Sequence, residues 1–149
     1  MPGAPADGDE GARALDRAVR ALARRDHSIE SLRAKLERAG VSEEAREAAL
    51  DSLTRAGYLD DERFAHDRAA QLASRGYGDE WIRADLARQA VPAGAAEEAL
   101  AAIPPEHERV AQQAARLGSG LSAARSLRRR GFSEDAVEAV LARAVAEES

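Results

Sequence analysis

The stretch Gly57-Tyr58-Leu59-Asp60-Asp61-Glu62-Arg63-Phe64-Ala65 contains the signals that end one helix and begin another. Gly57 follows a segment with helical apolar spacing, and glycine readily adopts the left-handed conformation that ends a helix. Asp60 or Asp61 can cap the next helix, and Phe64 would begin the buried face of that helix. We therefore expect Gly57, Asp60, Asp61 and Phe64 to form a structural joint between two helical units.

Helical units of one design recur along the chain. Three sets of apolar residues share spacings of 5, 4 and 5: Leu36, Val41, Ala45 and Leu50; Leu86, Val91, Ala95 and Leu100; and Leu127, Phe132, Ala136 and Leu141. The helix-start residues Ser42, Pro92 and Ser133 fall at equivalent places in the three sets. We predict an all-α fold of three tandem three-helix repeats, in which each repeat packs on its neighbour to form an elongated, curved array.

The repeats set the expected domain boundaries. We place repeat 1 at residues 13–56, repeat 2 at 57–105 and repeat 3 at 106–149. Residues 1–12 are rich in Pro, Gly and Asp and have no periodicity, which indicates a disordered acidic tail. In the first helix, the predicted core-facing residues are Leu15, Ala18, Val19 and Leu22.

The types of residue present argue against catalysis and against metal binding. The chain has no cysteine and three histidines, and His27 falls in a short interhelical turn where we expect it at the surface. We expect no catalytic constellation, no metal site and no cofactor, so the protein is not predicted to be an enzyme. No stretch is apolar and long enough to span a membrane, and the absence of cysteine fits the reducing cytoplasm, where we expect the protein.

Charge is unevenly distributed. The net charge of −5 divides into −3 for residues 1–12, +2 for 13–56, −4 for 57–105 and zero for 106–149. Such a chain is not a general polyanion binder, but a local basic face could meet nucleic acid while an acidic face meets a protein.

Arginines at helical spacing are the candidate binding residues. Arg13, Arg17, Arg20 and Arg24 would share one face of the first helix, either as a solvated face or as a row that binds phosphates. Arg38, Arg88 and Arg129 recur near predicted helix C-termini, where they either complement the helix dipole or line a groove. The run Arg128-Arg129-Arg130 is denser than capping requires, which suggests a binding role. The set that we select is Arg24, Arg25, Arg38, Arg88, Arg125, Arg128, Arg129 and Arg130.

The lone tryptophan is the main aromatic candidate for nucleic-acid contact. Trp81 lies beside Ile82 in a predicted helix, on a face that adjoins the apolar stripe. Because single aromatic platforms are rare, we expect Trp81 in the core rather than as a base-stacking surface.

The junction motif also resembles a known family. Gly57-Tyr58-Leu59-Asp60-Asp61-x-x-Phe64-Ala65, followed by Arg75-Gly76-x-Gly78 and a helix with Ile82 and Leu86, is similar to the RecX family of recombination regulators. The resemblance covers roughly residues 13–145. The chain departs from the family pattern at Ala90, where a glycine is usual, and in its weaker third repeat.

This resemblance implies a non-enzymatic regulator of the RecA recombinase in DNA repair, recombination and the SOS response. Such a protein would lie in the groove of the RecA filament on single-stranded DNA, touch DNA indirectly or weakly, and inhibit recombinase, ATPase and co-protease activities. We expect a monomer. The alternative is an independent nucleic-acid-binding protein built from helix-turn-helix-like units.

Overall fold

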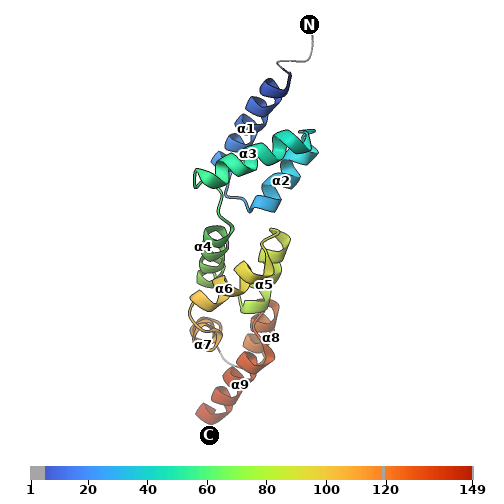
Figure 1. The fold of residues 1–149 in the computed structure, drawn as a ribbon. Helices are drawn as coiled ribbons and strands as arrows, with labels where there is room; N and C mark the ends of the chain where they lie inside the picture. The colour runs from blue at the N-terminus through green and yellow to red at the C-terminus, as the bar shows by residue number, and fades with distance from the viewer. Residues whose placement is uncertain (1–5, 119, 149) are drawn as a thin grey trace. The chain divides into compact units, whose positions relative to one another are not determined.

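The computed structural model of the chain describes residues 6–118 and 120–148, and over these ranges it contains nine α-helices and no strand (Figure 1). Their bounds are α1 Ala6–Arg24, α2 Ile29–Arg38, α3 Glu43–Arg55, α4 Asp61–Ser74, α5 Asp79–Arg88, α6 Ala93–Ala102, α7 Glu106–Leu117, α8 Leu121–Arg129 and α9 Glu134–Glu148. The all-α class and the succession of three-helix repeats are as predicted. None of the described helices combines the length and the apolar character needed to cross a membrane.

Local capping fixes where the helices begin. The Ser28 and Ser42 hydroxyls accept hydrogen bonds from the backbone N–H groups of Ser31 (3.0 Å) and Ala45 (3.3 Å), at the starts of α2 and α3. The Ser133 hydroxyl accepts from the N–H of Ala136 (3.2 Å) at the start of α9. Each of these contacts satisfies a backbone donor that the first turn of a helix leaves unpaired.

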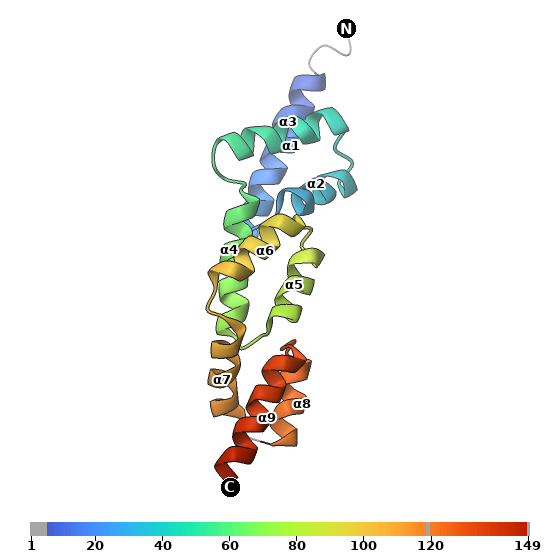
Figure 2. The same ribbon diagram turned by 60° about the horizontal axis from the view of Figure 1, so that its bottom comes forward.

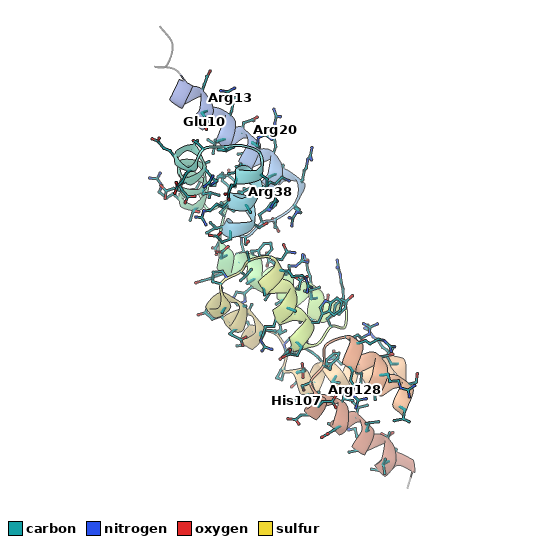
Figure 3. The ribbon with its side chains drawn as sticks, turned by 90° about the vertical axis from the view of Figure 1, so that its right-hand side faces the viewer. Glu10, Arg13, Arg20, Arg38, His107 and Arg128 are labelled. Carbon is teal, nitrogen blue, oxygen red and sulfur yellow. The ribbon has the colours of Figure 1, made fainter. Side chains whose placement is uncertain are left out.

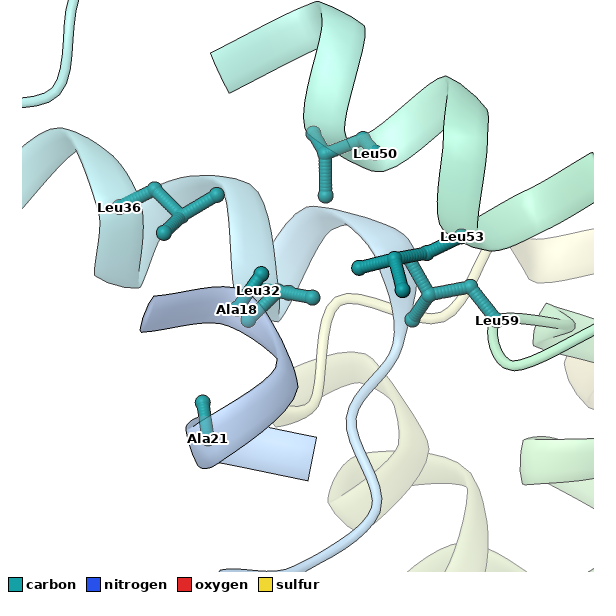
Figure 4. Close-up of a cluster of buried hydrophobic side chains, with 7 residues drawn as sticks. All are labelled: Ala18, Ala21, Leu32, Leu36, Leu50, Leu53 and Leu59. Atoms are coloured by element: carbon teal, nitrogen blue, oxygen red, sulfur yellow. The ribbon is translucent and has the colours of Figure 1, made fainter. Parts of the chain in front are cut away.

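The chain divides into two compact units. Unit 1 comprises residues 1–64 and 89–92, and unit 2 comprises residues 65–88 and 93–149. In unit 1, leucines from α2, α3 and the turn after α3 meet alanines of α1 (Figure 4). The cluster consists of Ala18, Ala21, Leu32, Leu36, Leu50, Leu53 and Leu59.

Helix α1 buries only part of the predicted face: Ala18 is buried and Leu22 packs against the core cluster as predicted, but Leu15 and Val19 do not. Leu15 and Val19 are 38% and 48% exposed, whereas Ala14 and Ala18 are fully buried. Ala14 packs against Ala45 and Ala49 of α3. Small side chains allow two helices to approach closely, so an alanine stripe faces the core together with Leu22, while Leu15 and Val19 lie outside it.

The start of α1 also differs from the prediction. Residues 6–12 are helical, so the expected disordered tail is wrong for this part, while residues 1–5 lie outside the described residues. The Glu10 carboxylate accepts a hydrogen bond from the backbone N–H of Ser42 (2.9 Å), which ties the first turns of α1 to the start of α3. This partner is 32 residues away and is invisible to local periodicity.

In unit 2, α7, α8 and α9 lie side by side (Figure 2), and residues of all three helices form one apolar cluster. This cluster consists of Val110, Ala124, Leu127, Phe132, Ala136, Val137 and Val140. It includes Leu127, Phe132 and Ala136 of the repeated apolar pattern, so the third copy of that pattern forms a core as the first copy does.

Each unit contains one set of long-range hydrogen bonds at the start of the second helix of a repeat, and we call such a set a polar joint. In unit 1, the Ser28 hydroxyl donates to the carbonyl of Gln89, and Asp61 accepts from the N–H of Ile29 (2.8 Å). In unit 2, the N–H of Gly78 donates to the carbonyl of Arg130 (2.7 Å). Glu106 of unit 2 accepts from the N–H of Asp79 (2.8 Å), which lies 50 residues after Ile29. The second helix of each of the first two repeats is therefore capped by an acid that begins the next repeat.

The joint buries a histidine that the sequence suggests is exposed. His27 is only 3% exposed, and its Nδ1 lies 2.9 Å from the Ser31 hydroxyl. The neighbouring Ser28 is fully buried, and its hydroxyl contacts the carbonyl of Gln89, a residue that belongs to the same unit although it lies 61 positions later.

Candidate nucleic-acid and partner-binding surfaces

An open groove of about 780 Å³ runs along α1 in unit 1, between this helix and the end of α2. Its cationic lining residues are Arg13, Arg17, Arg20, Arg24 and Lys35, which we call the basic groove. The 3.6-residue period of α1 brings the four arginines to one side of the helix, and the packing of α2 against α1 adds the lysine. Figure 3 shows Arg13 and Arg20 following Glu10 along α1.

The two carboxylates that line the basic groove already have partners. Glu10 accepts from the backbone of Ser42, and this hydrogen bond lowers the pKa of Glu10. Asp16 lies 3.1 Å from the guanidinium of Arg20. The groove therefore carries five cations and two engaged anions, which leaves a surface suited to the phosphates of a polyanion.

The predicted binding residues of unit 1 lie in or near this groove. Arg24 lines it, and Arg25 and Arg38 are exposed at the ends of α1 and α2. Within residues 6–118 and 120–148, the side chains of Arg24, Arg25 and Arg38 form no ion pair or hydrogen bond, so their donors face solvent.

The arginine cluster at the end of α8 is less available than its sequence suggests. Arg128 forms two hydrogen bonds with Glu134 (2.7 and 3.2 Å), which lower the pKa of the Glu134 carboxyl. Arg130 donates to the carbonyl of Arg75 (3.2 Å), and Arg129 donates to the Ser126 hydroxyl (3.2 Å). Only Arg125 of this group is exposed without an ion pair or side-chain hydrogen bond in the described chain. Of these four arginines, only Arg128 has a carboxylate partner, and Arg125, Arg129 and Arg130 have none within the described residues.

Arg88 lies next to a buried carboxylate, that of Asp85, which the sequence did not reveal as a site. Asp85 of α5 is 7% exposed and accepts two hydrogen bonds from Arg68 of α4, the longer of them 2.9 Å. Arg88 lies 3.7 Å from the same carboxylate. Because Arg68 and Asp85 are 17 residues apart on different helices, only the packing of unit 2 brings them together.

The junction residues each occupy a distinct place. Gly57 has a φ of +84° after α3, and Asp60 accepts from the backbone N–H of Arg63 (3.0 Å) to cap α4. Asp61 instead reaches back to the start of α2, and Phe64 is 7% exposed. The two adjacent aspartates therefore cap two different helices.

Unit 2 contains a buried arginine that local patterns did not reveal. Arg109 is 5% exposed, donates to Asp79 and to the carbonyl of Tyr77 (2.6 Å each), and lies 5.9 Å from the centre of the Phe132 ring. Glu106 bridges the N–H groups of Asp79 and Ser133 one turn earlier. The repeat alignment was the available signal, since it places Glu106 at the start of repeat 3 as Asp61 is at the start of repeat 2.

These features define a helical-repeat protein with polar joints and separate arginine surfaces. Residues 14–53 match the family model of the first three-helix domain of RecX, and residues 60–100 match that of the second. A regulatory protein RecX from Stenotrophomonas maltophilia (strain R551-3) is 36% identical over 137 residues, which cover 83% of this chain and 82% of the relative. One from Xanthomonas oryzae pv. oryzae (strain MAFF 311018) is 34% identical over 135 residues, with 84% of each chain covered. The chain belongs to the RecX family.

Solved structures agree on the fold. The crystal structure of RecX from Lactobacillus salivarius superposes with a TM-score of 0.77 at 17% identity, covering 91% of this chain and 97% of that one. A second RecX crystal structure gives a TM-score of 0.75 at 20% identity, covering 89% and 73%. At these identities the likeness establishes the helical-repeat architecture alone.

Proposed function

We propose that this protein binds the RecA filament on single-stranded DNA and inhibits its recombinase, ATPase and co-protease activities without catalysing a reaction. Membership of a family whose members are called regulatory proteins supports a regulatory role. The basic groove is the observation that carries the nucleic-acid part of the proposal, because five cations with two engaged anions suit a phosphate backbone.

A protein without catalysis can still control a filament. A ligand that touches neighbouring protomers and DNA together gains affinity from each added contact, because the later contacts form within one complex. Such a ligand shifts the filament between states in proportion to its preference for one of them. The arginine surfaces would contribute the DNA contacts, and the rest of the repeats would contact the recombinase.

The decisive experiment is a titration of this protein into RecA that is hydrolysing ATP on single-stranded DNA. We expect the ATPase rate to fall as the protein approaches stoichiometry with RecA. An unchanged rate at stoichiometric protein would contradict the proposal.

The basic groove is tested by the triple substitution Arg17→Ala, Arg20→Ala and Arg24→Ala. Its matched control removes the same charge from exposed arginines outside the groove: Arg55→Ala, Arg63→Ala and Arg116→Ala. We expect the groove variant to weaken inhibition and to reduce the salt dependence of single-strand binding, by about 2 in the log–log slope for three lost phosphate contacts. Equal behaviour of the two variants would remove the groove from the mechanism.

The arginines at the end of α8 are tested in two separate variants. Because Arg128 is paired with Glu134, we expect Arg125→Ala with Arg129→Ala to weaken inhibition more than Arg128→Ala does. A larger effect of Arg128 alone would show that its pair with Glu134 opens on binding.

The alternative function, an independent nucleic-acid-binding protein, is favoured by the same basic groove. A gel shift without RecA separates the two. Tight, sequence-dependent binding to duplex DNA would support the alternative, whereas weak and salt-sensitive binding supports the regulator.

A further inference from the structure

Tyr77 and Trp81 form a stacked aromatic pair in unit 2, at the start of α5. Their ring centroids are 4.5 Å apart and the ring planes meet at 12°. Trp81 is 37% exposed, although the sequence places it in the core. The expectation failed because Trp81 is stacked on another aromatic ring and not inserted between helices.

The pair is held in place by a backbone contact. The turn between α8 and α9 passes so close that a Cβ on Gly131 would lie 2.5 Å from the Trp81 nitrogen and 2.6 Å from its Cβ. The N–H of Glu80 donates to the carbonyl of Gly131 (3.1 Å). The backbone of Trp81 is therefore fixed against this turn while more than a third of the residue remains open to solvent, and a preorganised ring needs little ordering when it binds a ligand.

Two arginines without carboxylate partners in the described chain, Arg75 and Arg130, lie on the segments next to the pair. Arg130 precedes the Gly131 that contacts the Trp81 backbone, and it donates to the carbonyl of Arg75 (3.2 Å), two residues before Tyr77. The segments that carry these two arginines therefore adjoin the segments that carry the two rings. Within residues 6–118 and 120–148, neither Arg75 nor Arg130 forms an ion pair with a carboxylate.

Three carboxylates near the pair, at the starts of α5 and α7, are engaged. Asp79 is paired with Arg109 (2.6 Å), and Glu80 with Arg83 (2.9 Å). Glu106 accepts from two backbone N–H groups. The surface beside the rings therefore favours an anionic ligand with a flat, apolar part.

We propose that the Tyr77–Trp81 pair is a stacking platform for an unpaired nucleobase, with Arg75 and Arg130 holding the adjacent phosphates. Single-stranded nucleic acid combines an exposed π-face with a flanking negative charge, and aromatic side chains stack on it with little sequence preference. A base inside a duplex is covered by its neighbours and could not reach the platform. This inference goes beyond the proposed function, which places only phosphate contacts on the protein, and its test needs no RecA.

The test uses the intrinsic fluorescence of Trp81, which is the single tryptophan of the chain. Titration with oligothymidylate should quench this emission, because a stacked base couples to the indole. An abasic oligonucleotide of the same length carries the same phosphates without bases and should bind with little quenching. Equal quenching by both ligands would overturn the proposal, as would stronger quenching by a duplex.

Substitution provides the second readout. Fluorescence anisotropy of labelled oligothymidylate should show Trp81→Ala binding about 5- to 150-fold more weakly, the range for loss of one stacked base. Trp81→Phe keeps an aromatic face and should recover much of the affinity, which also separates stacking from a folding defect. Tyr58→Ala, at an exposed aromatic of unit 1, is the matched control and should bind normally. Unchanged binding by Trp81→Ala, or a loss that Phe does not restore, would contradict the platform.

Discussion

Ala90 is held in a conformation that suits glycine, and replacing it should stabilise the protein. Its φ is +60°, and it is the only non-glycine with positive φ among residues 6–118 and 120–148. Gly40 and Gly131, at the equivalent positions after α2 and α8, have φ values of +84° and +85°. In the left-handed region the Cβ of an L-residue crowds the following carbonyl, which costs about 1–2 kcal/mol.

The expected gain is the difference between two effects. Ala90→Gly removes the steric cost in the folded state, but glycine also gives the unfolded chain more conformations, which opposes folding by about 0.4–1 kcal/mol. We expect a net stabilisation of about 0.5–1 kcal/mol, or a rise in melting temperature of ~1–4 °C for a chain of this size. Ala90 is exposed, so packing contributes little to the difference.

Urea denaturation followed by far-ultraviolet circular dichroism measures the effect. The matched control is Ala39→Gly, the same change at the exposed C-cap of α2, where φ is −81°. There only the unfolded-state effect operates, so the control should lose about 0.5–1 kcal/mol. If Ala90→Gly destabilises the protein as the control does, the assignment of strain to Ala90 is wrong.

Three further predictions concern groups that the fold buries or brings together. Burial, with the positive charges of Arg25 and Lys35, lowers the pKa of His27 to about 4. The folded state thus binds fewer protons than the unfolded one, so stability that is full above about pH 6.5 should fall towards pH 4, by at most about 3–4 kcal/mol. His27→Gln should flatten this pH dependence in urea titrations, whereas His107→Gln at an exposed site should retain it. Asp85→Asn should lower the free energy of unfolding by about 2–3 kcal/mol, because it leaves the half-buried Arg68 without its charge partner. Asp51→Asn, in an exposed ion pair, should lower it by under about 0.5 kcal/mol. Equal losses of stability in the two variants would contradict a role for the buried pair. Gly131→Ala should destabilise by more than about 2 kcal/mol, since its Cβ would meet the Trp81 backbone, whereas Gly40→Ala has open space at a similar φ and should cost only about 1 kcal/mol; similar values would exclude the close contact.

The repeats were predictable because the signals that define them act between residues close together in the sequence. Helix caps such as Ser42 and Ser133, and stop residues such as Gly57, act over three or four residues, so the sequence alone reveals them. The recurring apolar spacing then indicates that the units are copies of one design. The elongated, curved shape expected of the array stays a prediction.

The candidate surfaces were only partly predictable. The helical period placed Arg13, Arg17, Arg20 and Arg24 on one face, and they do line one groove. Closeness in the sequence overstated how many arginines at the end of α8 are available for binding. Arg128 is paired with Glu134 across a turn, and Arg130 donates to a carbonyl 55 residues away. A run of charges shows which residues are present but not which of them are already engaged.

The sequence by itself determined the helices, their ends and their threefold repetition, since these depend on interactions between near neighbours along the chain. The tertiary structure decided which face of α1 is buried, where His27 and Trp81 lie, and which arginines remain free. Those outcomes depend on partners tens of residues away, such as Gln89 for Ser28 and Gly131 for Glu80. Gly57 and the two aspartates after it link the two levels: Gly57 ends α3 and Asp60 caps α4 through local contacts, while Asp61 caps α2 only because the chain folds back.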